Sequence, residues 1–177
     1  FKYSNKIMGV LKVLFVVPEI RLDSKPNHIP FWAGILAAIV EQKGGQVAIL
    51  DLNALRTKYG GKQVPSEIIV KEISSEKWDM VGIGGLTTTY ARIKQLAPLI
   101  RKYSPDSLFV GGGGWSTYNP TEILELIPAL DLIVIGEGED TVKRILKIYK
   151  DSKFDLEKTY KTIENLDVPI HLDVLSI

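Results

Sequence analysis

Five short apolar runs, rich in β-branched residues and poor in charge, are spaced along the chain. A strand that is buried on both faces shows a continuous apolar run rather than an alternation of apolar and polar residues. We therefore expect these runs to form five strands of a parallel sheet with helices on both faces. The runs occupy residues 10–17, 46–50, 80–83, 107–110 and 132–135.

Helix-length segments separate the runs, and their apolar residues recur at spacings of three and four. Ile93, Leu96 and Ile100, for example, would share one face of a helix. Asn119 and Pro120 are suited to the cap and to the first position of a helix. The expected helices occupy residues 30–42, 65–74, 88–102, 119–126 and 139–149.

The alternation of strand and helix predicts an α/β fold: a doubly wound, five-stranded parallel sheet of flavodoxin-like (Rossmann-like) type, in three α/β/α layers. Five strands suit the order 2-1-3-4-5. Right-handed crossovers then place a ligand outside the carboxyl ends of the strands, near the point where the strand order reverses. We therefore expect the functional residues in the segments that follow the strands.

Charge and cysteine content narrow the classes of function. The 177 residues fit one domain, and 22 Lys+Arg against 21 Asp+Glu leave a net charge of +1. Neither a nucleic-acid partner nor a membrane partner is expected from that balance, and no apolar run reaches the ~18 residues of a membrane span. Without any cysteine, the chain alone cannot form a disulfide or hold an iron–sulfur cluster through thiolates. We expect a cytoplasmic protein.

Glycines and hydroxyl residues gather after the expected strands. Glycines follow the third, fourth and fifth runs, beginning at Gly84, Gly111 and Gly136. Glycine lets a backbone approach a ligand closely, and a wide glycine floor suits a large flat ligand better than a compact phosphate. Each feature also has a purely structural interpretation, in which the glycines form turns, the threonines after Gly85 cap a helix and Trp115 packs on a neighbouring helix.

Motifs for several common cofactors are missing. A dinucleotide fingerprint requires glycines directly after the first strand, but the loop at residues 18–28 contains none. No GxxxxGK[ST] loop for a nucleoside triphosphate is present. The third run ends at Gly84 rather than at the aspartate of a phosphoacceptor domain, and no Ser/His/acid set can be assembled.

The ordered set of segments resembles the N-terminal cobalamin-binding domain of cobalamin-dependent radical S-adenosylmethionine proteins. The resemblance spans residues 9–149, and the Gly-Glu-Gly-Glu segment at residues 136–139 is its most characteristic part. The segments that carry it are KVLFVVPE (12–19), GILAAIVEQKGGQVAILDLN (34–53), WDMVGIGGLTTTY (78–90), SLFVGGGGWSTYNPTEIL (107–124) and DLIVIGEGEDTVKRIL (131–146).

The resemblance implies that a corrinoid, cobalamin, lies across the carboxyl ends of the strands with its nucleotide tail inside the domain. It assigns the tail pocket to residues 84–88 and 111–116, places residues 136–139 beside it and puts Glu19 below the corrin ring. No catalytic residue is expected. The cofactor-binding residues expected on this basis are Glu19, Gly84, Gly85, Leu86, Thr87, Thr88, Gly111, Gly112, Gly113, Trp115, Ser116, Gly136, Glu137, Gly138 and Glu139.

The first loop departs from one motif of cobalamin proteins. Methyl-transfer cobalamin proteins often carry Asp-x-His-x-x-Gly there, with the histidine on the cobalt. In this chain Asp23 and His28 are five residues apart, and no glycine stands three residues after His28. The resemblance therefore leaves His28 as a weak candidate for a cobalt ligand, and a cobalt without a protein imidazole matches much of the radical family.

The resemblance also divides the chain. Residues 9–150 would form the cobalamin-binding-like domain, and residues 151–177 a linker towards a missing radical S-adenosylmethionine domain, which would hold the iron–sulfur cluster and S-adenosylmethionine. We expect a corrinoid-binding module of a radical enzyme, supporting methyl transfer or a related radical reaction such as ring formation. The alternatives are a scaffold or protein-interaction domain of the same fold without cobalamin, and a small enzyme or flavin carrier of flavodoxin type.

Overall fold

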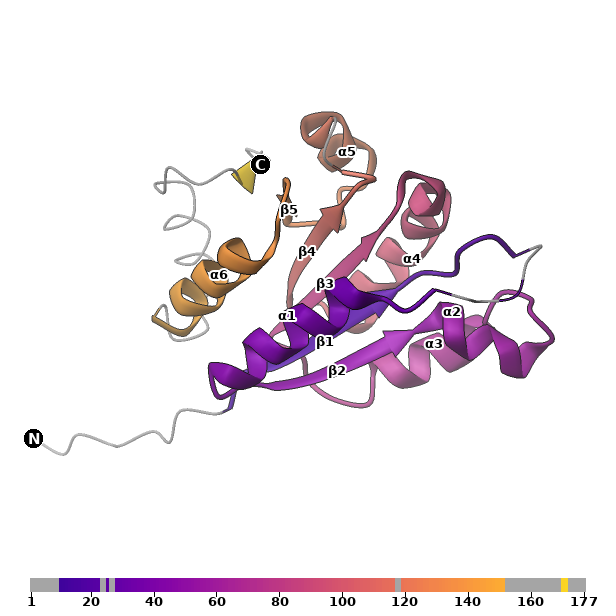
Figure 1. Cartoon of the computed structure of the whole chain (residues 1–177), viewed down its shortest axis with the longest axis horizontal. Coiled ribbons are helices and arrows are strands. Elements are labelled where there is room, and N and C mark those ends of the chain that lie inside the picture. Colours follow the sequence, from indigo (N-terminus) through magenta and orange to yellow (C-terminus); the bar gives the residue numbers. More distant parts are fainter. Residues whose placement is uncertain (1–9, 23–24, 26–27, 117–118, 152–169, 172–177) are drawn as a thin grey trace, which may run out of the picture.

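The computed structural model describes residues 10–22, 25, 28–116, 119–151 and 170–171 of the 177-residue chain. Within this part of the chain, six strands form one sheet in the order β2-β1-β3-β4-β5-β6 (Figure 1). The first five are parallel to one another, so the expected order 2-1-3-4-5 is confirmed. They are β1 (Lys12–Val17), β2 (Gln46–Asp51), β3 (Met80–Gly85), β4 (Leu108–Gly113) and β5 (Leu132–Val134), and β6 is Ile170–His171.

The sixth strand was not expected from the sequence. The two residues of β6 pair antiparallel with β5, Ile170 opposite Val134 and His171 opposite Ile133. They belong to the segment interpreted as a linker, whose residues 152–169 and 172–177 lie outside the described part of the chain. An antiparallel edge strand on an otherwise parallel sheet is common in doubly wound folds.

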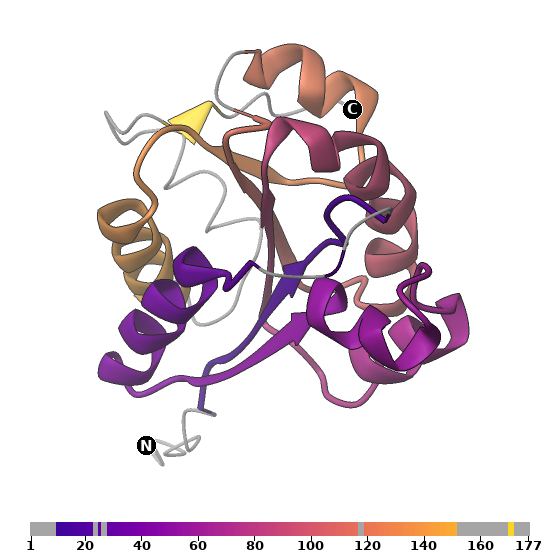
Figure 2. The same ribbon diagram turned by 45° about the vertical axis from the view of Figure 1, so that its right-hand side comes forward.

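Helices cover both faces of the sheet (Figure 2). Side chains of α1 (Phe31–Gln42) and α6 (Glu139–Asp151) pack into one hydrophobic core on what we call the α1/α6 face. Side chains of α3 (Ser66–Ile73), α4 (Tyr90–Tyr103) and α5 (Pro120–Leu126) pack into a second core on the opposite face, the α3/α4/α5 face. The three expected layers are therefore present. Among the described residues, no helix has both the length and the hydropathy of a membrane span.

The short elements were the least predictable. The one-turn helix α2 (Leu52–Leu55) and the 3-10 helices η1 (Arg56–Tyr59) and η2 (Thr87–Thr89) have too few residues for a periodic pattern. Asp51, the last residue of β2, begins α2 by accepting a hydrogen bond from the Ala54 N–H at 2.9 Å. Asn119 and Pro120 occupy the cap and the first position of α5, as expected, although the Asn119 side-chain amide donates to the Glu122 carboxylate and makes no capping bond to the backbone of α5.

Strands β3 and β4 are longer than their apolar runs. Both continue through the glycines that were expected to form loops, and Gly84 pairs with Gly112 and Gly85 with Gly113. Glycine is depleted in strands, but the parallel ladder to the neighbouring strand holds these residues extended. The centre of the sheet therefore ends in a strip of backbone without side chains.

Candidate functional site

The glycines at the carboxyl end of β3 and β4 do not all face the same way. Successive strand residues point to opposite faces of a sheet. A Cβ placed on Gly84 would meet the Trp32 ring at 2.8 Å, on the α1/α6 face, whereas one on Gly111 would meet the Trp115 ring at 2.9 Å, on the α3/α4/α5 face. At Gly112 a Cβ would meet only Val134, at an ordinary contact distance of 3.6 Å.

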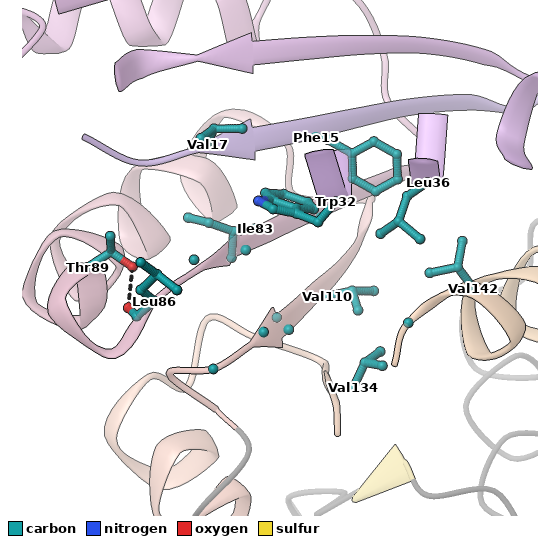
Figure 3. A pocket seen from close by; sticks show the side chains of 18 of the residues that line it. Phe15, Val17, Trp32, Leu36, Ile83, Leu86, Thr89, Val110, Val134 and Val142 are labelled. Atoms are coloured by element: carbon teal, nitrogen blue, oxygen red, sulfur yellow. Dashed lines mark hydrogen bonds between the residues drawn. The ribbon is translucent and has the colours of Figure 1, made fainter. Parts of the chain in front are cut away.

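A cavity of about 420 Å³ opens where the α1/α6 face is bare (Figure 3). Its volume lies in the range of sites for small organic ligands, roughly 300–1,000 Å³. The walls are mostly apolar and come from strands β1, β3, β4 and β5 and from helices α1 and α6. The apolar side chains that form them are Phe15, Val17, Pro18, Ile20, Trp32, Leu36, Met80, Ile83, Leu86, Val110, Val134 and Val142.

Ten of the expected site residues line this cavity. They lie at the carboxyl end of β3 or β4, or between β5 and the first residue of α6. The ten are Gly84, Gly85, Leu86, Gly111, Gly112, Gly113, Gly136, Glu137, Gly138 and Glu139. His28, the weak candidate for a metal ligand, also lines the cavity, from the loop before α1.

Glu19 is among the expected residues that the structure places elsewhere. Its side chain is 1 % exposed, and the Arg92 guanidinium donates to both carboxylate oxygens, at 2.7 and 2.9 Å. The Val64 N–H donates to one of the same oxygens at 2.9 Å. Glu19 therefore fastens the end of β1 to α4 and to the segment before α3, and it does not contribute to the cavity wall.

Trp115 lies on the far side of the sheet from the cavity, and Ser116 does not line the cavity. Trp115 is buried under Gly111, and its indole N–H donates to the Gly112 carbonyl at 2.8 Å. The Ser116 hydroxyl donates to the Gly113 carbonyl at 3.1 Å. Since Gly111 faces α3/α4/α5, the residues that follow β4 support the glycine strip from behind.

The two threonines are also absent from the cavity wall. Thr87 and Thr88 are both exposed in η2, and the Thr87 hydroxyl lies 3.5 Å from the Gly114 carbonyl. Thr89, which was not a candidate, does line the cavity, and its hydroxyl donates to the Leu86 carbonyl at 2.7 Å. A Cβ on Gly85 would collide with that hydroxyl at 2.2 Å, so Thr89 and Gly85 fit only as a pair.

The first loop is held in place by a buried arginine. Arg56 is 0 % exposed and donates to the carbonyls of Ile20 and Arg21 at 3.2 Å each, and to that of Gly61 at 2.8 Å. The side-chain amide oxygen of Asn53 accepts a hydrogen bond from the Ile20 backbone N–H at 3.0 Å. Because Ile20 lines the cavity, these bonds fix one rim of the opening.

Acidic residues gather where α6 begins. Glu139 and Asp140 occupy its first turn, where the positive end of the helix dipole favours carboxylates. The Lys143 ammonium donates a hydrogen bond to Asp140 at 2.8 Å and thereby lowers the pKa of that carboxyl. Among the described residues, no three His, Asp or Glu side chains gather as a metal site. The cavity therefore offers shape and apolar contact more than charge.

A comparison with protein-family models matches residues 20–146 to the B12 binding domain. That match covers most of the chain and ends inside α6. The chain belongs to the B12-binding domain family. The expected resemblance to cobalamin-dependent radical S-adenosylmethionine proteins is confirmed at the level of this domain, and the flavin-carrier alternative is set aside.

Curated relatives of this B12-binding domain are much longer than the chain. An anaerobic magnesium-protoporphyrin IX monomethyl ester cyclase of Rubrivivax gelatinosus is 24% identical over 147 residues, which cover 81% of the chain and 25% of that protein. Cytidylyl-2-hydroxyethylphosphonate methyltransferase of Streptomyces wedmorensis is 30% identical over 145 residues, 73% of the chain and 27% of that protein. The chain spans about a quarter of the length of these relatives.

Solved structures share the fold of this B12-binding domain. The radical S-adenosylmethionine methyltransferase TsrM of Kitasatospora setae, with cobalamin and a [4Fe-4S] cluster bound, has a TM-score of 0.67 at 19% identity over 81% of the chain and 27% of TsrM. The cobalamin-dependent radical enzyme OxsB with aqua-cobalamin has a TM-score of 0.68 at 17% identity, covering 81% of the chain and 19% of OxsB. The domain thus has the fold of a part of each of these two radical enzymes.

The lining residues that the sequence did not reveal are those that look like ordinary core. Phe15, Val110 and Val134 belong to apolar runs, and Leu36 and Val142 lie on the inner sides of their helices. A pattern of apolar positions shows which residues point inward but not whether the space before them is filled. One sequence signal could have revealed them. A glycine within a strand, on the same face as neighbouring core residues, indicates that the space in front of those residues is not filled by a side chain at that position.

Proposed function

We propose that the chain binds cobalamin with its nucleotide tail in the cavity on the α1/α6 face and its corrin ring over the carboxyl ends of the central strands. The observation that carries this placement is the bare strip of β4 at Gly112, over which the protein leaves an apolar space. The family assignment supports the cofactor, and the geometry of the cavity supports the position.

The residues present fit such a ligand. A Cβ at Gly112 would project into space that no other side chain fills, so this glycine forms a cradle for a group that comes from outside the protein. The walls formed by Val110, Val134 and Val142 are apolar and suit a flat, weakly polar base. A cavity of about 420 Å³ holds the tail but not the whole corrinoid, which leaves the ring outside.

The residues around the opening would then have distinct roles. The segment from Gly136 to Glu139 lines the cavity where α6 begins, and Pro18 and Ile20 line it from the loop after β1. Arg56 and Glu19 would act on the ligand only indirectly, by fixing that loop. When bound, a corrinoid supplies a cobalt that can accept and transfer a methyl group. This chain would hold the ring, exclude water beneath it and present its other side to a partner.

We further propose that this partner is a radical S-adenosylmethionine domain, joined through residues 151–177, and that the whole protein transfers a methyl group or forms a ring. The relatives named above, a methyltransferase and a cyclase, support this assignment. No side chain of this chain is proposed as a catalytic acid or base.

The test is a titration of the 177-residue protein with hydroxocobalamin, followed by desalting and a visible absorption spectrum. The proposal expects retained colour with a changed spectrum, in a ratio that saturates at one corrinoid per chain. It also expects the same spectrum in the His28→Ala variant, since that imidazole is not assigned to the cobalt. Loss of all colour on desalting, with no saturable change during the titration, would contradict the proposal.

One observation favours a second candidate, a scaffold or protein-interaction domain that has lost cobalamin. Phe31 is 70% exposed and Ile35 47% exposed, one turn apart on the outer side of α1, and the neighbouring Ile29 is 66% exposed. Apolar residues gathered in this way mark contact surfaces. This candidate predicts no saturable binding of hydroxocobalamin by a correctly folded protein, so the same titration separates the two.

A further inference from the structure

The three tryptophans of the chain differ in what their indole N–H groups do. The Trp78 N–H donates to the Ile73 carbonyl at 2.8 Å, and the Trp115 N–H donates to the Gly112 carbonyl at 2.8 Å. Both of these side chains are buried. Trp32 is partly exposed and lines the cavity, and its N–H makes no hydrogen bond to any residue in the described part of the chain.

The Trp32 ring packs against the sheet, although its N–H has no partner among the described residues. Its ring meets Phe15 edge-on, with ring centroids 6.0 Å apart at an interplanar angle of 82°. The six-membered part of the indole lies on Gly84, where even a Cβ would come within 2.8 Å. In Figure 3 the indole nitrogen lies on the side of Val17, the last residue of β1, and not on the side of Leu36. The N–H is therefore near the carboxyl ends of the strands.

We propose that Trp32 is a ligand-binding residue whose indole N–H donates a hydrogen bond to an acceptor oxygen of the bound corrinoid. This inference rests on the proposed function and deepens it. Two groups of a cobalamin offer such an oxygen, the amide carbonyls at the edge of the corrin ring and the phosphate–ribose portion of the tail. Indole is a donor without acceptor capacity, so it would select for a ligand that presents an oxygen at this point of an otherwise apolar wall.

The chemistry around Trp32 explains why a single donor matters here. Its immediate contacts, Phe15 and Gly84, offer a ring edge and a bare backbone. The nearest hydroxyl on the wall, that of Thr89, already donates to Leu86. A ligand oxygen that left water for this wall would lose a hydrogen bond unless the indole replaced it.

The experiment compares the wild type with Trp32→Phe and with Trp78→Phe as a matched control. Phenylalanine keeps an aromatic ring against Phe15 and Gly84 but has no N–H. For hydroxocobalamin, we expect Trp32→Phe to raise the dissociation constant about fivefold, the size of one net hydrogen bond. The control removes an N–H that is satisfied inside the protein, and it should leave the dissociation constant unchanged.

A second measurement detects the bond itself. A ¹⁵N–¹H correlation spectrum shows one indole signal for each tryptophan, and loss of one signal in Trp32→Phe assigns it. Saturation with hydroxocobalamin should shift the Trp32 signal and slow its exchange with water. The exchange of the Trp78 signal should not change. A Trp32 that only packs against the sheet would show no slowing of exchange.

Cobinamide, which lacks the nucleotide tail, distinguishes the two sources of the oxygen. Slowed exchange with cobinamide assigns the acceptor to a ring amide, and slowed exchange with cobalamin alone assigns it to the tail. The inference is overturned if wild type binds hydroxocobalamin while the Trp32 N–H still exchanges as in the free protein, or if Trp32→Phe binds with equal affinity. Absence of binding by the wild type would instead contradict the proposed function.

Discussion

The two faces of the sheet both contain glycines next to aromatic side chains, but they differ in how completely the space over those glycines is filled. On the α3/α4/α5 face, the position opened by Gly111 is filled by Trp115 and Leu130. On the α1/α6 face, Phe15 covers Gly82 and Trp32 covers Gly84, but Gly112 stays uncovered beside Val134. One face is packed as a core, and the other is packed only up to the edge of a cavity.

This difference teaches that a glycine in a strand has no single meaning. At Gly111 a side chain is excluded because the Trp115 ring occupies the adjacent space. At Gly112, the next residue, no described side chain excludes a Cβ, which would meet only Val134 at an ordinary contact distance. Packed interiors contain few voids larger than a water molecule, so the uncovered glycine indicates a ligand that completes the packing.

The largest effect on the free energy of unfolding is expected from the buried Arg92–Glu19 ion pair on the α3/α4/α5 face. Replacing Arg92 with alanine leaves the Glu19 carboxylate buried without its cation, and we expect the free energy of unfolding to fall by about 3 kcal/mol. Urea unfolding measures this change. The control is Lys77→Ala, which breaks an ion pair to Asp106 whose side chains are 83% and 73% exposed and should cost at most about 1 kcal/mol. Equal effects of the two substitutions would show that Arg92 does not fasten the first loop.

A pair of alanine substitutions compares the two faces directly. Gly111→Ala forces a methyl group to 2.9 Å from the Trp115 ring, and we expect a loss of about 2 kcal/mol in the free energy of unfolding. Gly112→Ala places its methyl group at an ordinary distance from Val134, and we expect a change below about 0.5 kcal/mol. Urea unfolding of both variants tests the difference. A Gly112 variant as unstable as the Gly111 variant would mean that the α1/α6 face is as full as the other.

The smallest change in the free energy of unfolding is expected from the buried Tyr90 hydroxyl on the α3/α4/α5 face. The Tyr90 hydroxyl is buried and has no hydrogen-bond partner among the described residues, and its ring lies 6.2 Å from that of Trp115. Tyr90→Phe removes a desolvated group and should raise the free energy of unfolding by about 1 kcal/mol or less. Thermal unfolding is sensitive enough to measure it. A clear loss of stability would show that the hydroxyl has a hydrogen-bond partner in solution, such as a buried water molecule.

The layers and the strand order could be predicted from the sequence because they depend on periodic patterns. The apolar runs indicated the parallel strands, and spacings of three and four indicated the major helices. The ends of β3 and β4 could not be predicted in this way, since Gly84 and Gly112 carry no side chain to continue a pattern. Helix α2 depends on one capping bond from Asp51, which a pattern of apolar residues does not contain.

The place of the cavity was predictable, but its walls were not. The carboxyl ends of the strands and the segment at residues 136–139 were expected, and the cavity lies there. The resemblance assigned Trp115 and Ser116 to the tail pocket, yet Trp115 packs against Gly111 on the opposite face, and Ser116 does not line the cavity. Trp32 was not among the expected site residues, because a helix sequence does not show that a ring lies against a glycine of β3.

The central claim is that the corrinoid tail occupies the space over Gly112, and a bulky side chain there tests it most directly. The measurement is the amount of hydroxocobalamin retained after desalting by wild type, by Gly112→Leu and by a control, Gly34→Leu. Gly34 lies on the exposed side of α1, where a Cβ meets nothing within 4 Å, and it does not line the cavity. The account predicts that Gly112→Leu keeps the unfolding midpoint of the wild type and loses the corrinoid, whereas Gly34→Leu retains it. Retention of the corrinoid by a folded Gly112→Leu protein would contradict the account.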